Sequence, residues 1–408
     1  MIDLRTAEKK LMEYGQEHIL NGFSELPEEK KEHFLSAIEE LYLERLKSVL
    51  SQQRITHGTI EPLYALTRNE IEEKRSVYEE KGLSMLAEGK CAAIILAGGM
   101  GTRLGSDKPK GELSVGETRE LSLFECLVNT LKASCERAKN YAPLYIMTSE
   151  KNGEETRRFF KDKDYFGYPG EKVFFFVQDT APAVDLNGKL LLEAPGEIAS
   201  SPNGNGGWFK SLEKAGLVSG LKERGVEWLN IFSVDNPLQK ICDPVFLGAT
   251  AFSDLKCAGK VIKKNSPDEK LGVICLDVGR PSIVEYYEMT DAMHDERDEN
   301  GELKYAYGVI LNYLFRVDAL EAVEAMDLPV HSVKKKIPFI DSEGNLVNPE
   351  QENGFKFEFL ILDLINLIGE MLPFEVEREK EFAPIKNLHG VDSLDSARLL
   401  LKKNDIAI

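Results

Sequence analysis

Hydrophobic and polar positions follow two different patterns along the chain. From residue 3 to about residue 88, apolar residues such as Phe34, Ile38 and Leu41 recur at the spacing of one helix face, which predicts a helical N-terminal region. Beyond residue 89 the apolar residues gather in short continuous runs, which are typical of strands buried on both faces of a sheet. The clearest runs are Cys91–Ala97, Leu144–Thr148, Val173–Val177, Leu229–Val234 and Gly272–Leu276.

Helical or loop stretches separate these runs, and strands that alternate with helices favour an α/β fold with a mixed, mostly parallel sheet. The length of 408 residues agrees with two or three domains. The basic run Lys334–Lys336 and the turn-like stretch Ser342–Asn345 indicate a boundary near residue 330. We therefore expect a helical region at 1–88, an α/β domain at 89–330 and a small C-terminal α+β domain at 331–408.

Composition narrows the classes of ligand. The formal net charge is -18, from 69 acidic and 51 basic residues, and this excess disfavours nucleic acid or an anionic membrane surface as a partner. Any anionic ligand must therefore be held by a local group of basic residues. The sequence gives no indication of the oligomeric state.

The six cysteines and the first twenty residues indicate the cellular compartment of the protein. The six cysteines form no CxxC pair and have no nearby histidine that would complete a zinc set, so we expect reduced structural thiols. The first twenty residues mix charged and apolar positions and do not resemble a secretory signal. We expect a cytoplasmic location.

The segment Leu96–Lys110 is the strongest candidate for a binding site. Glycine permits close approach of a ligand to the backbone and positive φ, so that consecutive N–H groups can point at phosphate oxygens. The two familiar glycine-loop motifs fail on spacing, because a dinucleotide fingerprint needs glycine where Leu104 stands and no Gly-Lys-Ser/Thr sequence is present. The segment predicts a phosphate-binding loop in which the four glycines Gly98, Gly99, Gly101 and Gly105 expose the backbone and Arg103 and Lys110 add positive charge.

Three polar residues stand where a sheet or loop would present them to a ligand. Gln178 ends an apolar run and has an amide that both donates and accepts, although a glutamine satisfied by backbone would look the same. Asp235 follows another run, at the ligand-facing edge of such sheets, and could face a ligand or merely cap a helix or turn. Asn205, flanked by glycines, could project its amide toward a ligand or form an ordinary turn.

The motif LAGGMGTRLGSDKPKG at Leu96–Gly111 resembles the signature of the UDP-sugar pyrophosphorylases, which are UTP-dependent uridylyltransferases. The chain most resembles the UDP-N-acetylhexosamine branch of that family, because Gly204–Gly207 reads GNGG where the UDP-glucose enzymes usually carry GHGD. The likeness runs from about residue 90 through further elements: Phe175–Asp179, Ser233–Pro237, Pro267–Gly272, Ile283–Tyr286 and Glu381–Asn387.

The resemblance implies a Rossmann-like, GT-A-like catalytic core and a role for each matching residue. It places phosphate-neutralising catalytic groups at Arg103, Lys110 and Lys386. It implies nucleotide binding by Leu96, Gly98, Gly99, Gly101, Thr102, Gln178 and Gly204. It implies sugar binding by Asn205, Gly272 and Glu285, and Mg²⁺ binding by Asp235. By composition alone, Glu285 and Lys386 could equally be solvated surface residues.

The expected reaction joins UTP to N-acetylglucosamine 1-phosphate, giving UDP-N-acetylglucosamine and diphosphate. The sugar phosphate is already ionised, so no protein nucleophile or general base is required, which agrees with the scattered histidines. One departure from the family pattern concerns the sugar, because Val309 stands where an asparagine is usual. Glucose 1-phosphate and N-acetylgalactosamine 1-phosphate therefore stay open as alternatives, as does a nucleotide-binding protein without activity.

Overall fold

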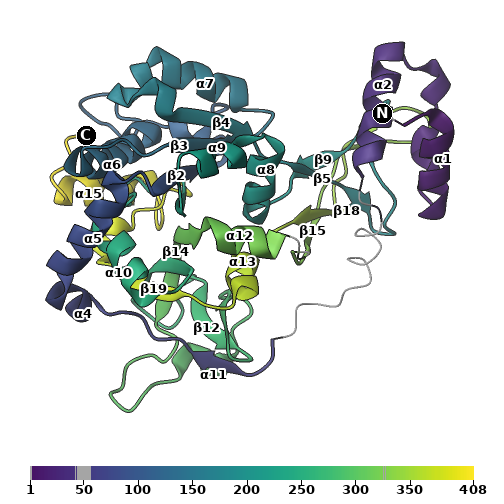
Figure 1. Ribbon diagram of the computed structural model, residues 1–408. Coiled ribbons are helices and arrows are strands. Elements are labelled where there is room, and N and C mark those ends of the chain that lie inside the picture. Colours follow the sequence, from purple (N-terminus) through teal and green to yellow (C-terminus); the bar gives the residue numbers. More distant parts are fainter. Residues whose placement is uncertain (1, 42, 44–56, 325, 327) are drawn as a thin grey trace. The chain divides into compact units, whose positions relative to one another are not determined.

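The apolar runs of the sequence form the strands of one large sheet in the computed structural model, which describes residues 2–41, 43, 57–324, 326 and 328–408 (Figure 1). All five predicted strands are present, with each end within one residue of its predicted position. They are β2 (Cys91–Leu96), β3 (Leu144–Thr148), β4 (Val173–Val177), β10 (Trp228–Ser233) and β12 (Val273–Asp277).

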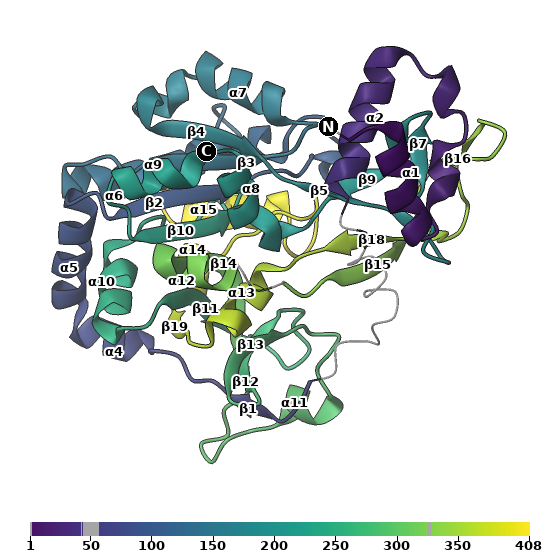
Figure 2. The same ribbon diagram turned by 45° about the vertical axis from the view of Figure 1, so that its right-hand side comes forward.

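The large sheet is mixed. Its path runs β1-β12-β14-β10-β2-β3-β4, and β10, β2, β3 and β4 are parallel neighbours (Figures 1 and 2). β14 lies antiparallel to β10, and β19 lies parallel to β11. The remaining strands of this sheet are β1 (Ile60–Pro62), β11 (Cys257–Lys263), β13 (Arg280–Val284), β14 (Tyr307–Arg316) and β19 (Leu372–Glu375). The predicted α/β class with a mixed sheet is confirmed, and the parallel strands carry the glycine-rich segment at their carboxyl edge.

Helices cover both faces of this sheet. Ala93 and Ile95 of β2 belong to one apolar cluster with residues of α5 (Arg75–Ala87), α6 (Leu123–Ala138), α7 (Gly153–Asp162) and α10 (Pro244–Ser253). α5 and α10 touch through glycines, because a Cβ on Gly82 would lie 1.9 Å from the Pro244 carbonyl oxygen. On the opposite face, Trp208 of α8 (Trp208–Lys214) contacts the ring of Phe315.

Other helices of the same unit connect or flank these elements. They are α4 (Arg68–Glu73), α9 (Leu217–Glu223), α11 (Asp291–Asp295), α12 (Val317–Glu324), α13 (Ile361–Ile368), α14 (Arg378–Glu381) and α15 (Leu394–Lys403). Two of them begin with capping boxes that satisfy backbone N–H groups, at Thr67 before α4 and at Ser393 before α15.

The chain divides into two compact units. Unit 2 holds the large sheet and consists of His57–Gln178, Trp208–Asp327 and Leu362–Ile408. Unit 1 has its own core and consists of Met1–Thr56, Asp179–Gly207 and Leu328–Ile361. Unit 1 contains α1 (Leu4–Glu13), α2 (Glu28–Glu40) and a sheet of β15 (His331–Lys335), β18 (Gly354–Glu358) and β6 (Val184–Asp185).

Three two-stranded pairs complete unit 1. They are β5 (Thr180–Pro182) with β9 (Ser200–Pro202), β7 (Leu192–Ala194) with β8 (Glu197–Ile198), and β16 (Phe339–Ile340) with β17 (Leu346–Val347). The unit 1 core brings together Leu11, Phe34, Ile38, Val184 and Phe357.

The two units divide the chain differently from the three consecutive segments that the sequence predicts. The described part of the expected N-terminal region 1–88 is mainly helical, but α1 and α2 belong to unit 1, α4 and α5 to unit 2, and strand β1 interrupts it. Residues 42 and 44–56 of that region lie outside the described residues. The expected C-terminal domain 331–408 is also divided, because β18 pairs with β6 in unit 1 and β19 pairs with β11 in unit 2.

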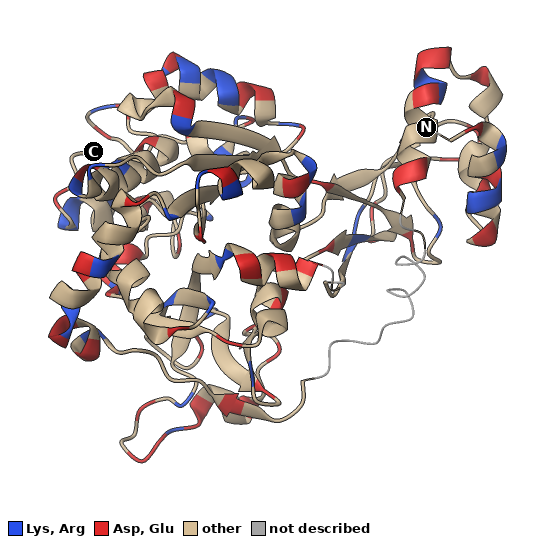
Figure 3. Cartoon of the chain, in the orientation of Figure 1, with Lys and Arg blue, Asp and Glu red and all other residues tan. Residues whose placement is uncertain are grey.

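Charged residues lie mainly on helices and loops. Figure 3 shows acidic and basic segments on both units, whereas the central strands of the large sheet carry few charges. Within the described ranges, every helix is too short or too polar to cross a bilayer.

Candidate nucleotide-binding site

The glycine-rich segment leaves the carboxyl end of β2 and folds back on itself. The Gly101 amide donates to the Lys108 carbonyl oxygen at 2.9 Å, and the Lys110 amide donates to the Gly99 carbonyl oxygen at 3.1 Å. A single 3-10 turn at Thr102–Leu104 lies within this hairpin and ends at Gly105, whose φ of 69° favours glycine. The predicted loop is therefore present, at the edge of the sheet where such folds bind ligands.

A buried asparagine that the sequence analysis did not single out holds this loop. The Asn152 amide nitrogen donates to the carbonyl oxygens of Ala97, at 2.9 Å, and Gly99, at 3.3 Å. Its amide oxygen accepts from the Ser149 N–H at 2.8 Å. The only local signal is an Asn-Gly pair after a predicted strand, which reads as an ordinary turn.

Gln178 joins the loop at its first glycine. Its side chain is buried, and its backbone N–H donates to the Thr148 carbonyl oxygen at 2.7 Å. A Cβ placed on Gly98 would lie only 2.7 Å from the Gln178 amide oxygen. The glycine therefore makes room for this amide, and the structure brings together two residues that lie far apart in the sequence.

Lys110 and Asp235 meet across the parallel part of the sheet. Asp235 follows β10, and its carboxylate lies 3.4 Å from the Lys110 ammonium, with both side chains about one-fifth exposed. At such a partly open position a ligand can reach both side chains. Arg103 and Thr102 are exposed on the 3-10 turn, and within the described residues the Arg103 guanidinium makes no ion pair.

The C-terminal segment reaches the same place through its backbone. The Ile385 N–H donates to the Asp235 carbonyl oxygen at 2.9 Å, so Lys386 follows directly after a residue bonded to Asp235. The Lys386 ammonium itself pairs with Asp392 at 3.0 Å. The backbone hydrogen bond thus brings the segment that carries Lys386 to Asp235. The Lys386 side chain is paired with Asp392, a carboxylate of the same segment.

The predicted sugar-binding pair is also assembled. A Cβ on Gly272 would lie 3.3 Å from a carboxylate oxygen of Glu285. Burial, and next the like charge of Glu288, raise the pKa of Glu285, while the charge of Lys386 opposes that rise. The Val309 N–H donates to the Gly272 carbonyl oxygen at 3.0 Å, so the residue that departs from the family pattern borders this pair.

Gly204 and Asn205 belong to unit 1, whereas the other candidate residues belong to unit 2. The Asn205 amide oxygen accepts from the Ile361 N–H at 3.0 Å. Gly204 has a φ of 82°, and a Cβ there would lie 2.4 Å from the Phe359 carbonyl oxygen. Packing within unit 1 thus explains both residues, and their predicted contacts with nucleotide and sugar stay predictions.

An α/β sheet with a basic glycine loop, an amide and a carboxylate at one edge is typical of the class of nucleotide-binding proteins. Comparison with known families identifies it further. Residues 32–407 match the family described as UTP–glucose-1-phosphate uridylyltransferase. The chain belongs to this family of nucleotidyltransferases, and the resemblance predicted from the motifs is confirmed.

Individual relatives and structures agree with this membership. UDP-N-acetylhexosamine pyrophosphorylase-like protein 1 of Xenopus tropicalis is 37% identical over 324 residues, which are 77% of this chain and 63% of that relative. UDP-N-acetylglucosamine pyrophosphorylase of Saccharomyces cerevisiae is 32% identical, with 96% of this chain and 88% of the relative covered. The crystal structure of the Trypanosoma brucei UDP-N-acetylglucosamine pyrophosphorylase has a TM-score of 0.84 at 28% identity, over 98% of this chain and 84% of that chain.

Proposed function

We propose that the protein transfers the uridylyl group of UTP to a sugar 1-phosphate, with N-acetylglucosamine 1-phosphate as the sugar substrate. The observation that carries the proposal is the pairing of Lys110 with Asp235 beside a glycine loop whose Gly98 packs against the Gln178 amide. The names of the relatives support the N-acetylated sugar. Gln178 would read the uracil ring, while the loop amides and Lys110 would hold the phosphates.

In this reaction an oxygen of the sugar phosphate attacks the α-phosphorus of UTP. The new P–O bond forms as the bond from the α-phosphorus to the bridging oxygen breaks, and diphosphate leaves with that electron pair. The attacking oxygen is already ionised, so the side chains need only align the two substrates and neutralise charge on the departing diphosphate. Arg103, Lys110 and Lys386 would supply that positive charge.

Asp235 is the residue that would hold Mg²⁺. Among the described residues no three acidic, histidine or cysteine side chains gather in one metal-binding group. This agrees with Mg²⁺ rather than a metal that needs an all-protein cage, because Mg²⁺ usually takes one or two carboxylates and completes its shell with water and phosphate oxygens. When bound, the ion would neutralise phosphate charge next to Lys110.

Replacement of Lys110 tests the assignment. We expect Lys110→Ala to lower kcat at least about a hundredfold, because a preorganised charge at the phosphates is lost. Unfolding stability should change by no more than about 1 kcal/mol, since the ion pair is partly exposed. The exposed Lys108 of the same loop is the matched control, and Lys108→Ala should leave the rate of diphosphate release almost unchanged.

An unaltered rate in Lys110→Ala would contradict the proposed roles. UTP binding without any diphosphate release by the unaltered chain would instead support the alternative of a binding protein without activity.

The choice of sugar has its own test. Diphosphate release from UTP should be fastest with N-acetylglucosamine 1-phosphate and slower with N-acetylgalactosamine 1-phosphate and glucose 1-phosphate. Val309, which offers no side-chain hydrogen bond beside Gly272, is the residue that would relax this preference. Equal kcat/KM for glucose 1-phosphate would overturn the N-acetyl assignment and leave uridylyl transfer intact.

We further propose a cytoplasmic location. All six cysteines are buried free thiols, which supports a reducing compartment.

A further inference from the structure

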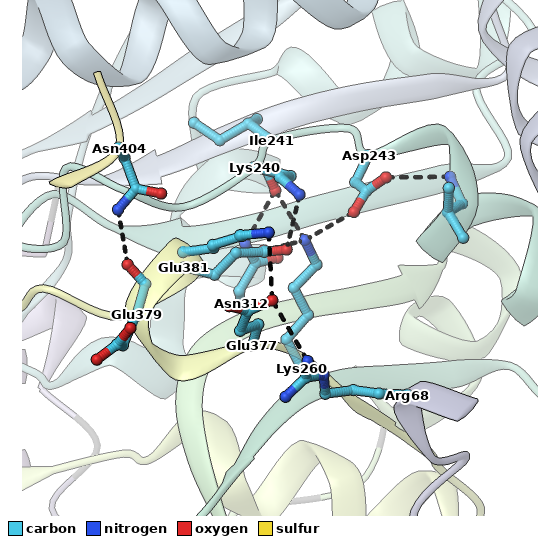
Figure 4. A network of polar contacts seen from close by, with 12 residues as sticks. Arg68, Lys240, Ile241, Asp243, Lys260, Asn312, Glu377, Glu379, Glu381 and Asn404 are labelled. Carbon is cyan, nitrogen blue, oxygen red and sulfur yellow. Dashed lines mark hydrogen bonds and ion pairs between the residues drawn. The ribbon is translucent and has the colours of Figure 1, made fainter. Parts of the chain in front are cut away.

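A fully buried lysine lies behind the site and is not part of it. Lys260 of β11 has an exposed fraction of 0% and donates to three acceptors (Figure 4). They are a carboxylate oxygen of Glu381 at 2.6 Å, a carboxylate oxygen of Asp243 at 3.1 Å and the carbonyl oxygen of Lys240 at 3.2 Å. An ammonium group has three donors, so the hydrogen-bonding capacity of Lys260 is fully used.

The group stays charged in spite of its burial. Burial alone would lower the pKa of Lys260, but the attraction of Glu381 and Asp243 holds that pKa above its usual value. Attraction of Lys260 and Lys240 likewise keeps the pKa of Asp243 below its usual value against the effect of burial. Buried ion pairs contribute little net stability compared with apolar side chains of similar size. Such an ion pair therefore fixes the positions of its partners more than it adds to stability.

The backbone around Lys260 is irregular in a way that suits this network. The pairing of β11 with β14 shifts register between Gly259 and Val261, so Lys260 stands opposite a bulge. Within that bulge Leu311 has a φ of 52°, which is unfavourable for a non-glycine residue. The next residue is Asn312, and its side-chain amide nitrogen donates to the Lys240 carbonyl oxygen at 3.3 Å. The same oxygen accepts from Lys260.

Glu381 connects this buried network to the site. The Asn236 amide nitrogen donates to the Glu381 carbonyl oxygen at 2.7 Å, and its amide oxygen accepts from the Ala383 N–H at 2.9 Å. The Ile385 N–H, two residues further on, donates to the carbonyl oxygen of Asp235, the residue before Asn236. The segment from Glu381 to Ile385 is therefore bonded to two consecutive residues that follow β10.

We propose that the Lys260–Glu381 ion pair positions the segment Glu381–Lys386 against Asp235, so that Lys386 and Asp235 present their charges to the same phosphates. Glu381 is fixed at its carboxylate by Lys260 and at its carbonyl by Asn236, which leaves the segment no freedom to shift along β10. This inference rests on the proposed function, because that function gives Asp235 and Lys386 their phosphate-binding roles. Lys260, Glu381 and Asn236 are thus positioning residues.

Hydrogen exchange tests the positioning without any substrate. In Glu381→Ala, Lys260 keeps Asp243 as a partner, so the variant should fold. We expect the backbone amides of Phe382, Ala383, Ile385 and Lys386 to exchange about tenfold faster, because a charge-assisted hydrogen bond that anchors the segment is lost. Glu381→Gln retains an acceptor for Lys260 and should restore most of the protection. Tyr168→Phe is the matched control, since it removes a buried hydrogen bond to Ala142 at the opposite edge of the sheet.

Kinetics test the consequence for the reaction. Glu381→Ala should lower kcat by about tenfold to a hundredfold, the loss expected when a reacting group is displaced by a fraction of an ångström to one ångström. KM for UTP should change little, because Gln178 and the glycine loop are untouched. In a Lys386→Ala background the same substitution should cost much less, since both changes act through one ammonium group. Glu381→Gln should recover most of kcat, and Tyr168→Phe should leave kcat unchanged.

Unaltered exchange at residues 382–386 in Glu381→Ala would overturn the positioning role. A kcat loss of equal size with and without Lys386 would overturn its connection to that residue. If the unaltered chain releases no diphosphate with any sugar 1-phosphate, the proposed function fails and the kinetic part of the inference fails with it. The exchange result then decides the structural part separately.

Discussion

Single atoms decide how the site is built. Gly98 has no Cβ, and that space is occupied by the amide oxygen of Gln178. The position of Lys110 opposite Asp235 likewise depends on the Gly99 to Lys110 hydrogen bond that closes the loop. At this scale small side-chain changes should alter binding before they alter folding.

Gly98→Ala is expected to raise KM for UTP about tenfold, because an added methyl group would lie 2.7 Å from the Gln178 amide oxygen and displace the amide that we propose reads the base. The obstructing atom is the far end of a flexible side chain, so the thermal midpoint should fall little. KM for the sugar 1-phosphate is the internal control. A variant with normal KM for UTP would show that Gln178 does not read the base.

The pH dependence of sugar binding should reflect Glu285. Its pKa is raised by burial and by Glu288, so the carboxylate that we propose accepts from sugar hydroxyls is lost at a higher pH than for an ordinary glutamate. KM for the sugar 1-phosphate should therefore rise as pH falls through the mildly acidic range. Glu288→Gln removes the like charge and should move this rise to lower pH. A profile that does not move would exclude Glu285 from sugar binding.

At the scale of elements, strands with a uniform apolar pattern were the predictable ones. β2, β3 and β4 are continuous apolar runs, and their positions followed from the sequence. β11 and β14 were not predicted, because buried Lys260 interrupts the apolar run of the first and the bulge at Leu311 interrupts the pairing of the second. Both irregularities are compensated only by partners far away in the chain, such as Glu381 and Lys240.

Glu213 of α8 and Glu324 of α12 share a proton, and this pair should make the stability of the folded protein depend on pH. A hydrogen bond with Glu213, followed by burial and the charge of Glu213, raises the pKa of Glu324 from 4.5 to about 7. The folded state therefore holds a proton that the unfolded state releases above pH 4.5, so this pair's contribution to stability falls as pH rises from 4.5 to about 7. Glu324→Gln should flatten that loss in thermal unfolding. The exposed Glu223→Gln is the control, and an equal change in both would contradict the shared proton.

At the scale of the whole molecule, each unit is assembled from three separated stretches. Residues 331–408 supply β18 to the small sheet of unit 1 and β19 to the large sheet of unit 2. They also supply Glu381 and Lys386. The stretch is thus a structural part of both units and not an appended domain.

Removal of residues 331–408 should abolish cooperative folding. The shortened chain would lose β15 and β18 from the small sheet of unit 1 and β19 from the large sheet of unit 2, and with them the backbone hydrogen bonds of those strands. Thermal unfolding followed by circular dichroism, together with limited proteolysis, would measure this, with the full chain as control. A sharp unfolding transition of the fragment 1–330 would show that the C-terminal stretch is independent after all.

The sequence alone determined the features that depend on neighbouring residues. Apolar runs specify buried strands, and a run of glycines with Arg103 and Lys110 predicts a loop suited to phosphate, because both features depend on local sterics and charge. Motif order then indicated the family, and with it Gln178, Asp235 and Glu285.

Tertiary structure alone decided which distant residues meet. The division into two units, the clamp of Asn152 on the loop and the network from Lys260 through Glu381 to Asn236 all join segments far apart in the chain. No local pattern encodes such contacts, since a buried lysine or asparagine becomes favourable only when the fold supplies its hydrogen-bonding partners.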